Sequence, residues 1–316
     1  MPPFSSISWP EGNLGIAFSA GKDSSALLAI AKESLPNREI FALHIDHQAR
    51  SKQSCEEECR TADSIAQHLD IPLKRKTLEK KLNSEAEWRE ERYRLLSQMG
   101  QELNLDHIAT AHHSKDQSET ILLNLLRGSD LTGLRGMPQY FKRNDQSFFR
   151  PLLNLTPKTL YTYLDSQNII AFEDPSNQES LFKRNQLRHQ ILPLLESFQP
   201  GCLDRINQLA PSIEKTLAWQ NQELLSLKMQ LKKTTLNESE ISYDRIHLQS
   251  TPDALLDLWS KSILITFAEG ARKINRQHIE ELSQFIKSEQ LGYLKTVLPG
   301  NIQVRGQKRS IIFKKV

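Results

Sequence analysis

The stretch SAGKDS, residues 19–24, follows the apolar run IAF at 16–18 and precedes a second apolar run, ALLAI, at 26–30. A strand, a turn of small and hydroxyl residues and a helix in this order predict a phosphate-binding turn, because amide groups at a helix N-terminus attract anions. The six residues by themselves leave one alternative open, a tight turn with a capping Asp or Ser.

The residue pattern of this turn excludes a Walker-type phosphate loop. That loop needs the pattern G-x-x-x-x-G-K followed by Ser or Thr. Here Gly15 lies one residue too far from Gly21, and Asp23 takes the place of the hydroxyl residue. Because a carboxylate repels phosphate unless a divalent cation lies between them, Asp23 indicates a Mg²⁺ site.

Apolar runs and helical patterns alternate through the first half of the chain. Strand candidates are residues 14–19, 39–46, 72–78 and 106–113, and helical spacing of apolar residues occurs in 24–34, 55–69 and 85–103. This alternation predicts an α/β fold, a parallel sheet with helices on both faces. The ligand is expected beyond the carboxyl ends of the strands, where SAGKDS and AHHSKDQ follow them.

The chain is long enough for two domains, with 316 residues of which 38% are hydrophobic and 25% charged. Beyond residue 150 the pattern changes to helix candidates at 156–167, 184–198 and 217–232, then to short strands and turns at 293–315. Pro200 and Gly201 interrupt the helical pattern. We therefore expect a catalytic domain at 1–200 and a smaller, mainly helical C-terminal domain at 201–316.

The net charge of +3 does not by itself identify a nucleic-acid binder, but the positive charge is unevenly distributed. No acidic residue follows Glu289, whereas these basic residues do: Lys295, Arg305, Lys308, Arg309, Lys314 and Lys315. Such a block is either an electrostatic footprint for phosphates or a solvated basic tail.

Three cysteines, Cys55, Cys59 and Cys202, are too few and too irregularly spaced for a disulfide framework, which indicates a reducing compartment. The start MPPFSSISWPEG lacks the charged and apolar regions of a signal peptide, and no stretch reaches the ~18 apolar residues of a membrane span. We expect a cytoplasmic protein that does not associate with membranes.

Further motifs follow SAGKDS in a fixed order: HIDHQAR at 44–50, TAHHSKDQSETILLNLLRGS at 110–129, GLRGMP at 133–138, FRPLL at 149–153 and EDPSNQESLFKRNQLRHQILPLL at 173–195. Together they resemble the PP-loop ATP pyrophosphatases, whose signature is S-G-G-x-D-S, and among them the tRNA(Ile)-lysidine synthetase family. The resemblance covers residues 13–196 and implies an adenine nucleotide alpha-hydrolase-like fold.

The resemblance implies a ligase that joins free L-lysine to the 2-carbonyl carbon of the wobble cytidine of tRNA(Ile) with a CAU anticodon. ATP and Mg²⁺ are the implied cofactors, since the cytidine oxygen is first adenylated and pyrophosphate leaves, and AMP leaves when lysine attacks. The product, lysidine, changes the codon read from AUG to AUA and the amino-acid identity from Met to Ile. The oligomeric state stays open, with a homodimer among the alternatives.

The nucleotide-binding residues implied are Ser19, Ala20, Gly21, Lys22, Asp23 and Ser24, with Asp23 on the metal. A capping box of Ser114 and Gln117 predicts a helix start that puts Asp116 and Glu119 on one face. By resemblance these two carboxylates bind the lysine substrate and belong to the catalytic set; the alternative is acidic residues that suit the helix dipole.

His112 and His113 are candidates for the base that deprotonates the attacking amine, since a pKa near ~6.5 suits that role. The alternative is a structural pair, in which His112 packs or forms hydrogen bonds near the nucleotide. The R-N-x-x-R stretch, Arg184, Asn185 and Arg188, is implied to contact phosphate or the adenylated intermediate, with Arg184 catalytic. Salt bridges to EDPS at 173–176 are the alternative.

Arg127 resembles another phosphate-contacting position of the family, or it simply suits a helix C-terminus. Contacts to tRNA phosphates are expected from the basic C-terminal third, including Arg272, Lys273 and Arg276.

Two residues depart from the family pattern. Ala20 replaces the first glycine of the loop. We expect this alanine to be tolerated only if the φ angle of Ala20 is negative. Lys115 replaces the first acidic residue of H-H-x-D-D-Q.

Two rival functions stay open. The first is tRNA thiolation, for which Cys55 and Cys59 would supply sulfur chemistry, although no C-x-x-C occurs. The second is a nucleotide sensor without catalysis, in which the pair of Asp116 and Glu119 and the R-N-x-x-R stretch would have no purpose.

Overall fold

The computed structural model describes residues 4–5, 7–46, 52–78, 84–173, 183–237, 240–267, 274–296 and 298–315. The chain forms two compact units, Met1–Ile213 and Glu214–Val316, each treated separately below. The division falls inside the long helix α9 (Cys202–Gln230), which begins directly after Pro200 and Gly201.

The first unit is built on a six-stranded sheet with the strand order β3-β2-β1-β4-β6-β5. Its strands are β1 (Leu14–Phe18), β2 (Ile40–Asp46), β3 (Leu73–Thr77), β4 (His107–Ala109), β5 (Tyr140–Arg143) and β6 (Gln146–Phe149). All neighbouring pairs are parallel except β5 and β6, which form an antiparallel hairpin. The four strands expected from the sequence are confirmed, whereas the β5–β6 hairpin was not predicted.

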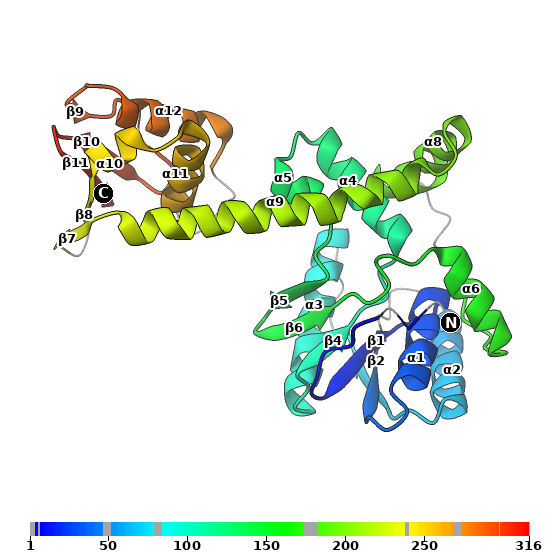
Figure 1. Cartoon of the computed structure of the whole chain (residues 1–316). Helices are drawn as coiled ribbons and strands as arrows, with labels where there is room; N and C mark the ends of the chain where they lie inside the picture. Colours follow the sequence, from blue (N-terminus) through cyan, green and yellow to red (C-terminus); the bar gives the residue numbers. More distant parts are fainter. Residues whose placement is uncertain are drawn as a thin grey trace. The chain divides into compact units, whose positions relative to one another are not determined.

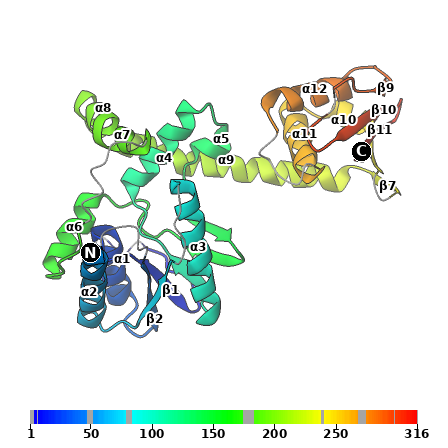
Figure 2. The ribbon, with the colours of Figure 1, turned by 180° about the vertical axis from the view of Figure 1, so that it is seen from behind.

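Helices cover both faces of this sheet, as the sequence predicted (Figures 1 and 2). The helices α1 (Lys22–Ser34), α2 (Lys52–His68) and α6 (Pro157–Ser166) pack on one face, and α3 (Glu85–Glu102) packs on the other. Strand β2 illustrates this arrangement. Its residues Ile40 and Ala42 belong to the hydrophobic core under α1, α2 and α6, whereas Leu43 and Ile45 belong to the core under α3. Side chains alternate between the faces of a strand, so a continuous apolar run is buried on both sides.

The remaining helices of this unit are α4 (Ser114–Leu126), α5 (Leu131–Leu134), α7 (Lys183–Gln186), the π-helical turn η2 (Leu187–Ile191), α8 (Leu192–Phe198) and the first part of α9. The helix predicted at 217–232 begins much earlier, at Cys202, and continues through Pro211. Pro211 removes one backbone donor and crowds the carbonyl four residues earlier, but the 29-residue helix continues on both sides of it.

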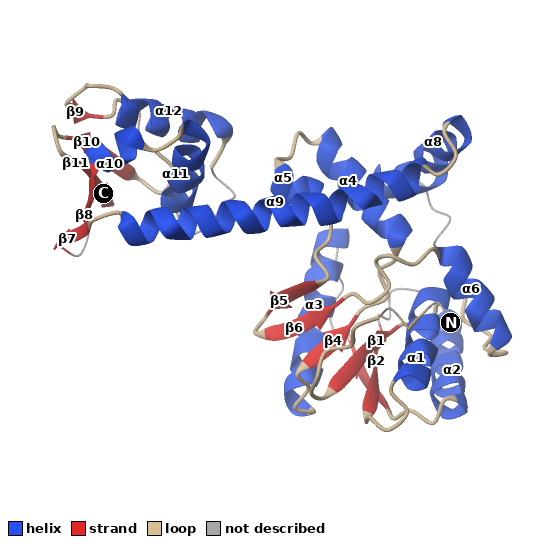
Figure 3. Ribbon diagram, in the orientation of Figure 1, coloured by secondary structure: helices blue, strands red, loops and turns tan. Residues whose placement is uncertain are grey.

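The second unit holds a five-stranded antiparallel sheet with the order β7-β8-β11-β10-β9, drawn in red in Figure 3. The strands are β7 (Lys233–Asn237), β8 (Glu240–Asp244), β9 (Gly292–Tyr293), β10 (Ile302–Gly306) and β11 (Ser310–Lys315). The strands and turns expected at 293–315 are thus confirmed, and β7 and β8 are additional. The helices of the unit are α10 (Arg245–Ser250), α11 (Asp253–Phe267) and α12 (Arg276–Lys287), together with the end of α9.

Candidate active site

The turn SAGKDS links the carboxyl end of β1 to the first turn of α1. Gly21 is the N-cap of the helix and has an extended conformation, with φ of −73°. The amide of Ser19 donates to Ser24 Oγ at 3.1 Å, and this hydroxyl donates to the carbonyl of Gly21 at 3.0 Å. The turn is therefore closed by its own serines.

Ala20 has a left-handed conformation with φ of +57°, so the expected negative φ is wrong. This conformation costs a residue with a Cβ about 1–2 kcal/mol. The carbonyl of Ala20 accepts a hydrogen bond of 2.9 Å from the amide of Phe172. A segment distant in sequence therefore helps to hold the turn in a shape that normally favours glycine.

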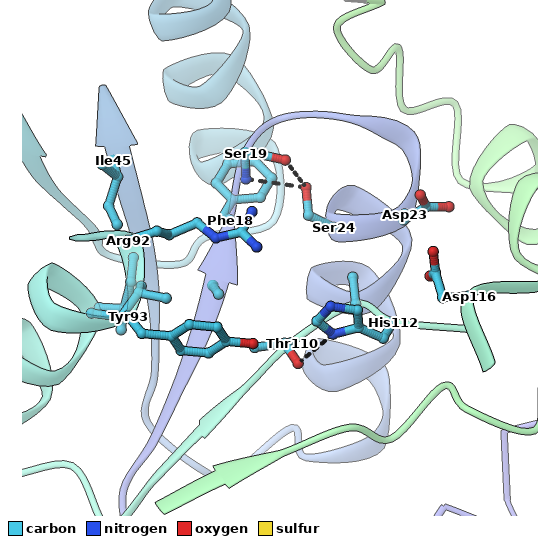
Figure 4. A pocket seen from close by; sticks show the side chains of 14 residues that line it. Phe18, Ser19, Asp23, Ser24, Ile45, Arg92, Tyr93, Thr110, His112 and Asp116 are labelled. Carbon is cyan, nitrogen blue, oxygen red and sulfur yellow. Dashed lines mark hydrogen bonds between the residues drawn. The ribbon is translucent and has the colours of Figure 1, made fainter. Parts of the chain in front are cut away.

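A cavity of about 210 Å³ opens beside this turn, at the carboxyl ends of the strands as predicted. Figure 4 shows the carboxylates of Asp23 and Asp116 facing each other at one end, with Arg92 reaching in from the opposite side. The cavity is lined by Ala17, Phe18, Ser19, Asp23, Ser24, Leu43, Ile45, Arg92, Tyr93, Leu96, Thr110, Ala111, His112 and Asp116. The apolar wall suits an aromatic base, and the polar end suits charged groups.

The carboxylate of Asp23 is held through one oxygen. Its Oδ1 accepts a hydrogen bond of 3.0 Å from the Tyr161 hydroxyl and lies 3.5 Å from Nε2 of His113. Burial raises the pKa of Asp23, but the hydrogen bond and charge of His113, with the bond from Tyr161, hold that pKa below its ordinary value. Asp23 therefore carries a full negative charge at neutral pH.

These groups fit a Mg²⁺ ion bound together with phosphates. Among the described residues, none donates a hydrogen bond to Oδ2 of Asp23, and the side chain is 41% exposed. Mg²⁺ commonly takes one or two protein carboxylates and completes its octahedron with phosphate oxygens and water. No group of three or more His, Cys, Asp or Glu side chains suited to a metal occurs in the described ranges, so a closed protein cage is not formed there.

Helix α4 carries the capping box one residue earlier than predicted. His113 is the N-cap: its Nδ1 accepts from the amide of Asp116, and its own amide donates to Asp116 Oδ2. Ser114 is already helical, and the side chain of Gln117 instead bonds the backbone of Met137. The expected pair of Ser114 and Gln117 is therefore wrong, because tertiary contacts take up the glutamine.

Asp116 and Glu119 share one face of α4, as predicted, and both are buried. Arg188 donates through Nε to Glu119 at 2.5 Å and through Nη2 to Asp116 at 2.7 Å. Arg184 donates through Nε to Glu119 at 3.0 Å and lies 3.5 Å from Asp116. The two arginines do face one side of their helix, but in this structure they hold these two carboxylates.

The surroundings of His112 and His113 shift the pKa values of these two side chains in opposite directions. Burial and the charges of nearby arginines, Arg150 and Arg92 foremost, lower the pKa of His112 well below its ordinary value. Burial also lowers the pKa of His113, but the hydrogen bond to Asp23 and the neighbouring carboxylates reverse this and raise it. The expected pKa near 6.5 therefore does not apply to His112, which stays neutral and bonds Thr110 Oγ1 at 3.0 Å.

The sequence interpretation missed the wall that α3 contributes. Arg92 and Tyr93 line the cavity, and around the Tyr93 ring lie the guanidinium groups of Arg89 and Arg92 from α3, at 5.6 and 5.9 Å from its centre, and that of Arg143 from β5, at 4.5 Å. A cationic wall of this kind suits phosphates or another anion. Arginines are common on exposed helices, so the spacing of these arginines in the sequence did not indicate that they line a cavity.

Other predicted residues lie apart from the cavity or outside the described residues. Arg127 is the exposed C-cap of α4, about 16 Å along the helix from Asp116 at 1.5 Å per residue. Lys22 pairs with Glu173 at 2.5 Å, and Asn185 lies in α7. Residues 47–50, 174–182, Arg272 and Lys273 lie outside the described residues.

The cysteines of the thiolation hypothesis lie on α2 and do not line the cavity. Burial raises the pKa of the Cys59 thiol, which disfavours a reactive thiolate. Among the described helices, none combines the length and the apolar composition that a membrane crossing requires.

Comparisons with known proteins agree with this architecture. The tRNA(Ile)-lysidine synthase of Porphyromonas gingivalis strain W83 is 33% identical over 76% of this chain and 52% of its own length. That of Clostridium perfringens strain ATCC 13124 is 28% identical over 84% of this chain and 58% of its own length. The chain thus spans about half the length of these curated relatives.

The fold is also found among solved structures. The U34-tRNA thiolase NcsA from Methanococcus maripaludis matches 67% of this chain and 74% of its own, with a TM-score of 0.56 and 14% identity, a likeness of fold alone. The family model of the PP-loop domain matches residues 5–195. Because that match spans more than half of the 316 residues, the chain belongs to the PP-loop domain family.

Proposed function

We propose that this protein ligates free L-lysine to the 2-carbonyl carbon of the wobble cytidine in tRNA(Ile) with a CAU anticodon, with release of AMP and pyrophosphate. One observation carries the proposal: two buried carboxylates, Asp116 and Glu119, share one face of α4, and Asp116 lies next to the loop carboxylate Asp23. A substrate with two ammonium groups calls for such a carboxylate pair. The names of the curated relatives support the same reaction.

The SAGKDS turn is proposed to bind the ATP phosphates. The amides that begin α1, the hydroxyls of Ser19 and Ser24 and the ammonium of Lys22 supply positive potential and hydrogen bonds there. A Mg²⁺ ion on Asp23, when bound, would neutralise phosphate charge. Arg92 stabilises negative charge from the far side of the cavity. The cytidine oxygen becomes a leaving group only after adenylation, because a ring carbonyl oxygen is a poor one.

Lysine is proposed to replace the arginines on the carboxylate pair. Arg184 and Arg188 now form ion pairs with Glu119, which is fully buried. Their side chains are 28% and 34% exposed, so the guanidinium groups have room to move out. The released arginines then contact the phosphate of the adenylated cytidine, which agrees with the role that the R-N-x-x-R stretch implies.

The C-terminal region, 201–316, is proposed to hold the tRNA backbone. The exposed cations of the second unit that have no ion pair with a described carboxylate include Lys295, Arg305, Lys308 and Arg309. Contacts of this kind are independent of sequence and weaken with salt. We propose the cytoplasm as the compartment, where tRNA is the abundant polyanion.

The test is incorporation of radiolabelled lysine into a tRNA(Ile) transcript in the presence of ATP and Mg²⁺. Label should require ATP and the wobble cytidine, and a transcript with uridine at that position is the control. Asp116→Asn should bind ATP normally but form no product. Pyrophosphate release without incorporation of label would contradict lysine as the nucleophile and favour another one.

A further inference from the structure

The segment from α6 to Glu173 contacts the nucleotide loop at three points. The amide of Phe172 donates to the carbonyl of Ala20, and Glu173 pairs with Lys22 at 2.5 Å. The third point is Tyr161, which lies on α6 and reaches the first turn of α1. No motif of the sequence assigned a role to Tyr161.

The Tyr161 hydroxyl fixes one oxygen of Asp23. It donates to Oδ1 at 3.0 Å, the same oxygen that faces His113. Because both donors lie on Oδ1, rotation of the carboxylate would break two contacts at once. Burial and the charge of Asp23 raise the pKa of Tyr161, so the hydroxyl keeps the proton that it donates.

The ring of Tyr161 also lies beside Lys22. The Lys22 ammonium is 5.9 Å from the ring centre, within the range of a cation–π interaction, and is bound to Glu173 on its other side. One aromatic side chain thus contacts both charged residues of the loop, the anion and the cation.

We propose that Tyr161 is a positioning residue of the nucleotide loop, which orients the Asp23 carboxylate so that Oδ2 stays available to the Mg²⁺ of bound ATP. This inference rests on the proposed function of Asp23 as the ligand of that ion. Tyr161 itself touches neither ion nor nucleotide and acts through Asp23.

The same helix offers a matched control. Tyr163 donates its hydroxyl to Glu33 Oε2 at 2.6 Å, also a bond from α6 to a carboxylate of α1, but near the end of α1 away from the loop. Tyr161→Phe and Tyr163→Phe remove the same atom from the same helix. A merely structural role predicts the same effect for both substitutions.

The readout is equilibrium binding of α,β-methylene-ATP by calorimetry at a series of Mg²⁺ concentrations, without turnover. Tyr161→Phe should raise the Mg²⁺ concentration for half-maximal binding about three- to tenfold, which corresponds to the net contribution of one ordinary hydrogen bond, and Tyr163→Phe should raise it less than twofold. Saturating Mg²⁺ should restore wild-type affinity to Tyr161→Phe, which also shows that the variant is folded.

Two results overturn the inference: equal effects of the two substitutions, or a loss of affinity in Tyr161→Phe that saturating Mg²⁺ does not restore. Asp23→Asn separates this failure from that of the proposed function. If Asp23→Asn leaves the Mg²⁺ dependence unchanged, Asp23 is not the metal ligand and both proposals about it fail. If it abolishes the dependence while Tyr161→Phe behaves as Tyr163→Phe, only the role of Tyr161 is refuted.

Discussion

Arg188 donates two hydrogen bonds to Glu119, from Nε to Oε1 at 2.5 Å and from Nη2 to Oε2 at 3.0 Å. Glu119 is fully buried, whereas the Arg188 side chain is one-third exposed. An arginine thus occupies the carboxylate proposed for a lysine substrate. The site is charged and ordered before the substrate arrives, and the substrate must displace a guanidinium rather than water.

Glu119→Gln should weaken lysine use without weakening ATP binding. Removal of a charged partner costs about 1.5–3 kcal/mol, so the KM for lysine should rise roughly ten- to a hundredfold. Affinity for an ATP analogue should stay within about twofold, because Glu119 does not line the cavity. Lysine incorporation and calorimetry measure the two quantities.

The control for this substitution is Glu33→Gln, which removes an exposed carboxylate of α1. It should leave the KM for lysine unchanged. An unchanged KM in Glu119→Gln as well would show that the carboxylate does not bind the substrate.

Ala20→Gly should leave the stability of the protein nearly unchanged, although Ala20 is fully buried. Loss of the buried methyl group costs about 0.8 kcal/mol and the greater entropy of glycine in the unfolded chain about 0.5–1 kcal/mol, whereas relief of the left-handed conformation returns about 1–2 kcal/mol. The urea midpoint should therefore change little. Ala26→Gly is the comparison, since Ala26 is equally buried but lies inside α1 and has no such strain to relieve, so its urea midpoint should fall clearly. An equal loss of stability in both variants would contradict the strain at Ala20.

The stability of the protein should depend on pH through His112. Its pKa is lowered in the folded state, so the unfolded state binds more protons as the pH falls below ~6.5, and stability decreases in that direction. One such group contributes at most about 1.4 kcal/mol per pH unit. Chemical unfolding between pH 7.5 and 5 should show a smaller loss of stability in His112→Asn than in the wild type.

The exposed His68 provides the control for this measurement. His68→Asn should follow the wild-type curve. A His112→Asn curve that is parallel to the wild type over the same range would mean that His112 titrates normally.

Charge reversal on the C-terminal sheet should weaken tRNA binding and its salt dependence. Arg305 and Lys308 are exposed, and Arg305→Glu with Lys308→Glu removes two phosphate contacts. The slope of log K against log salt should fall in magnitude by about 1.4–1.8, measured by filter binding at several salt concentrations.

A matched pair lies on the first unit, where Lys32 and Arg94 are each paired with a carboxylate. Their reversal to glutamate should leave the slope unchanged. If both double variants change the slope equally, the C-terminal cations are not a specific backbone contact.

The β5–β6 hairpin and the helix from Cys202 show where sequence reasoning fell short. Strand β5 is short and mostly exposed, so it lacks the apolar run that marked the parallel strands. In α9 the apolar residues Leu203, Ile206 and Ile213 do recur at helical spacing, but Pro211 lies among them, and a proline inside a helix is normally disfavoured. The hairpin therefore left a weak pattern in the sequence, and the helix left a conflicting one.

The site was predicted in part. The residues that were predicted lie close together along the chain, whereas those that were missed lie far from them in the sequence. The loop SAGKDS and the pair of Asp116 and Glu119 rest on contacts and spacings within six residues, which a motif preserves, whereas the cap of α4 was predicted at Ser114 and lies at His113 because Gln117 bonds Met137. Arg92 of α3 reaches the cavity beside this loop only because α3 packs on the same sheet, although two helices and two strands separate them along the chain.

The sequence by itself determined the alternation of strands and helices, the nucleotide turn and the family, because apolar periodicity and local spacing are properties of neighbouring residues. Only the tertiary structure decided that Arg188 pairs with Asp116 and Glu119, 72 and 69 residues earlier, and that Tyr161 reaches Asp23 across 138 residues. Such contacts depend on how whole helices pack, and side-chain pairing in a buried site follows the partners that packing brings within reach.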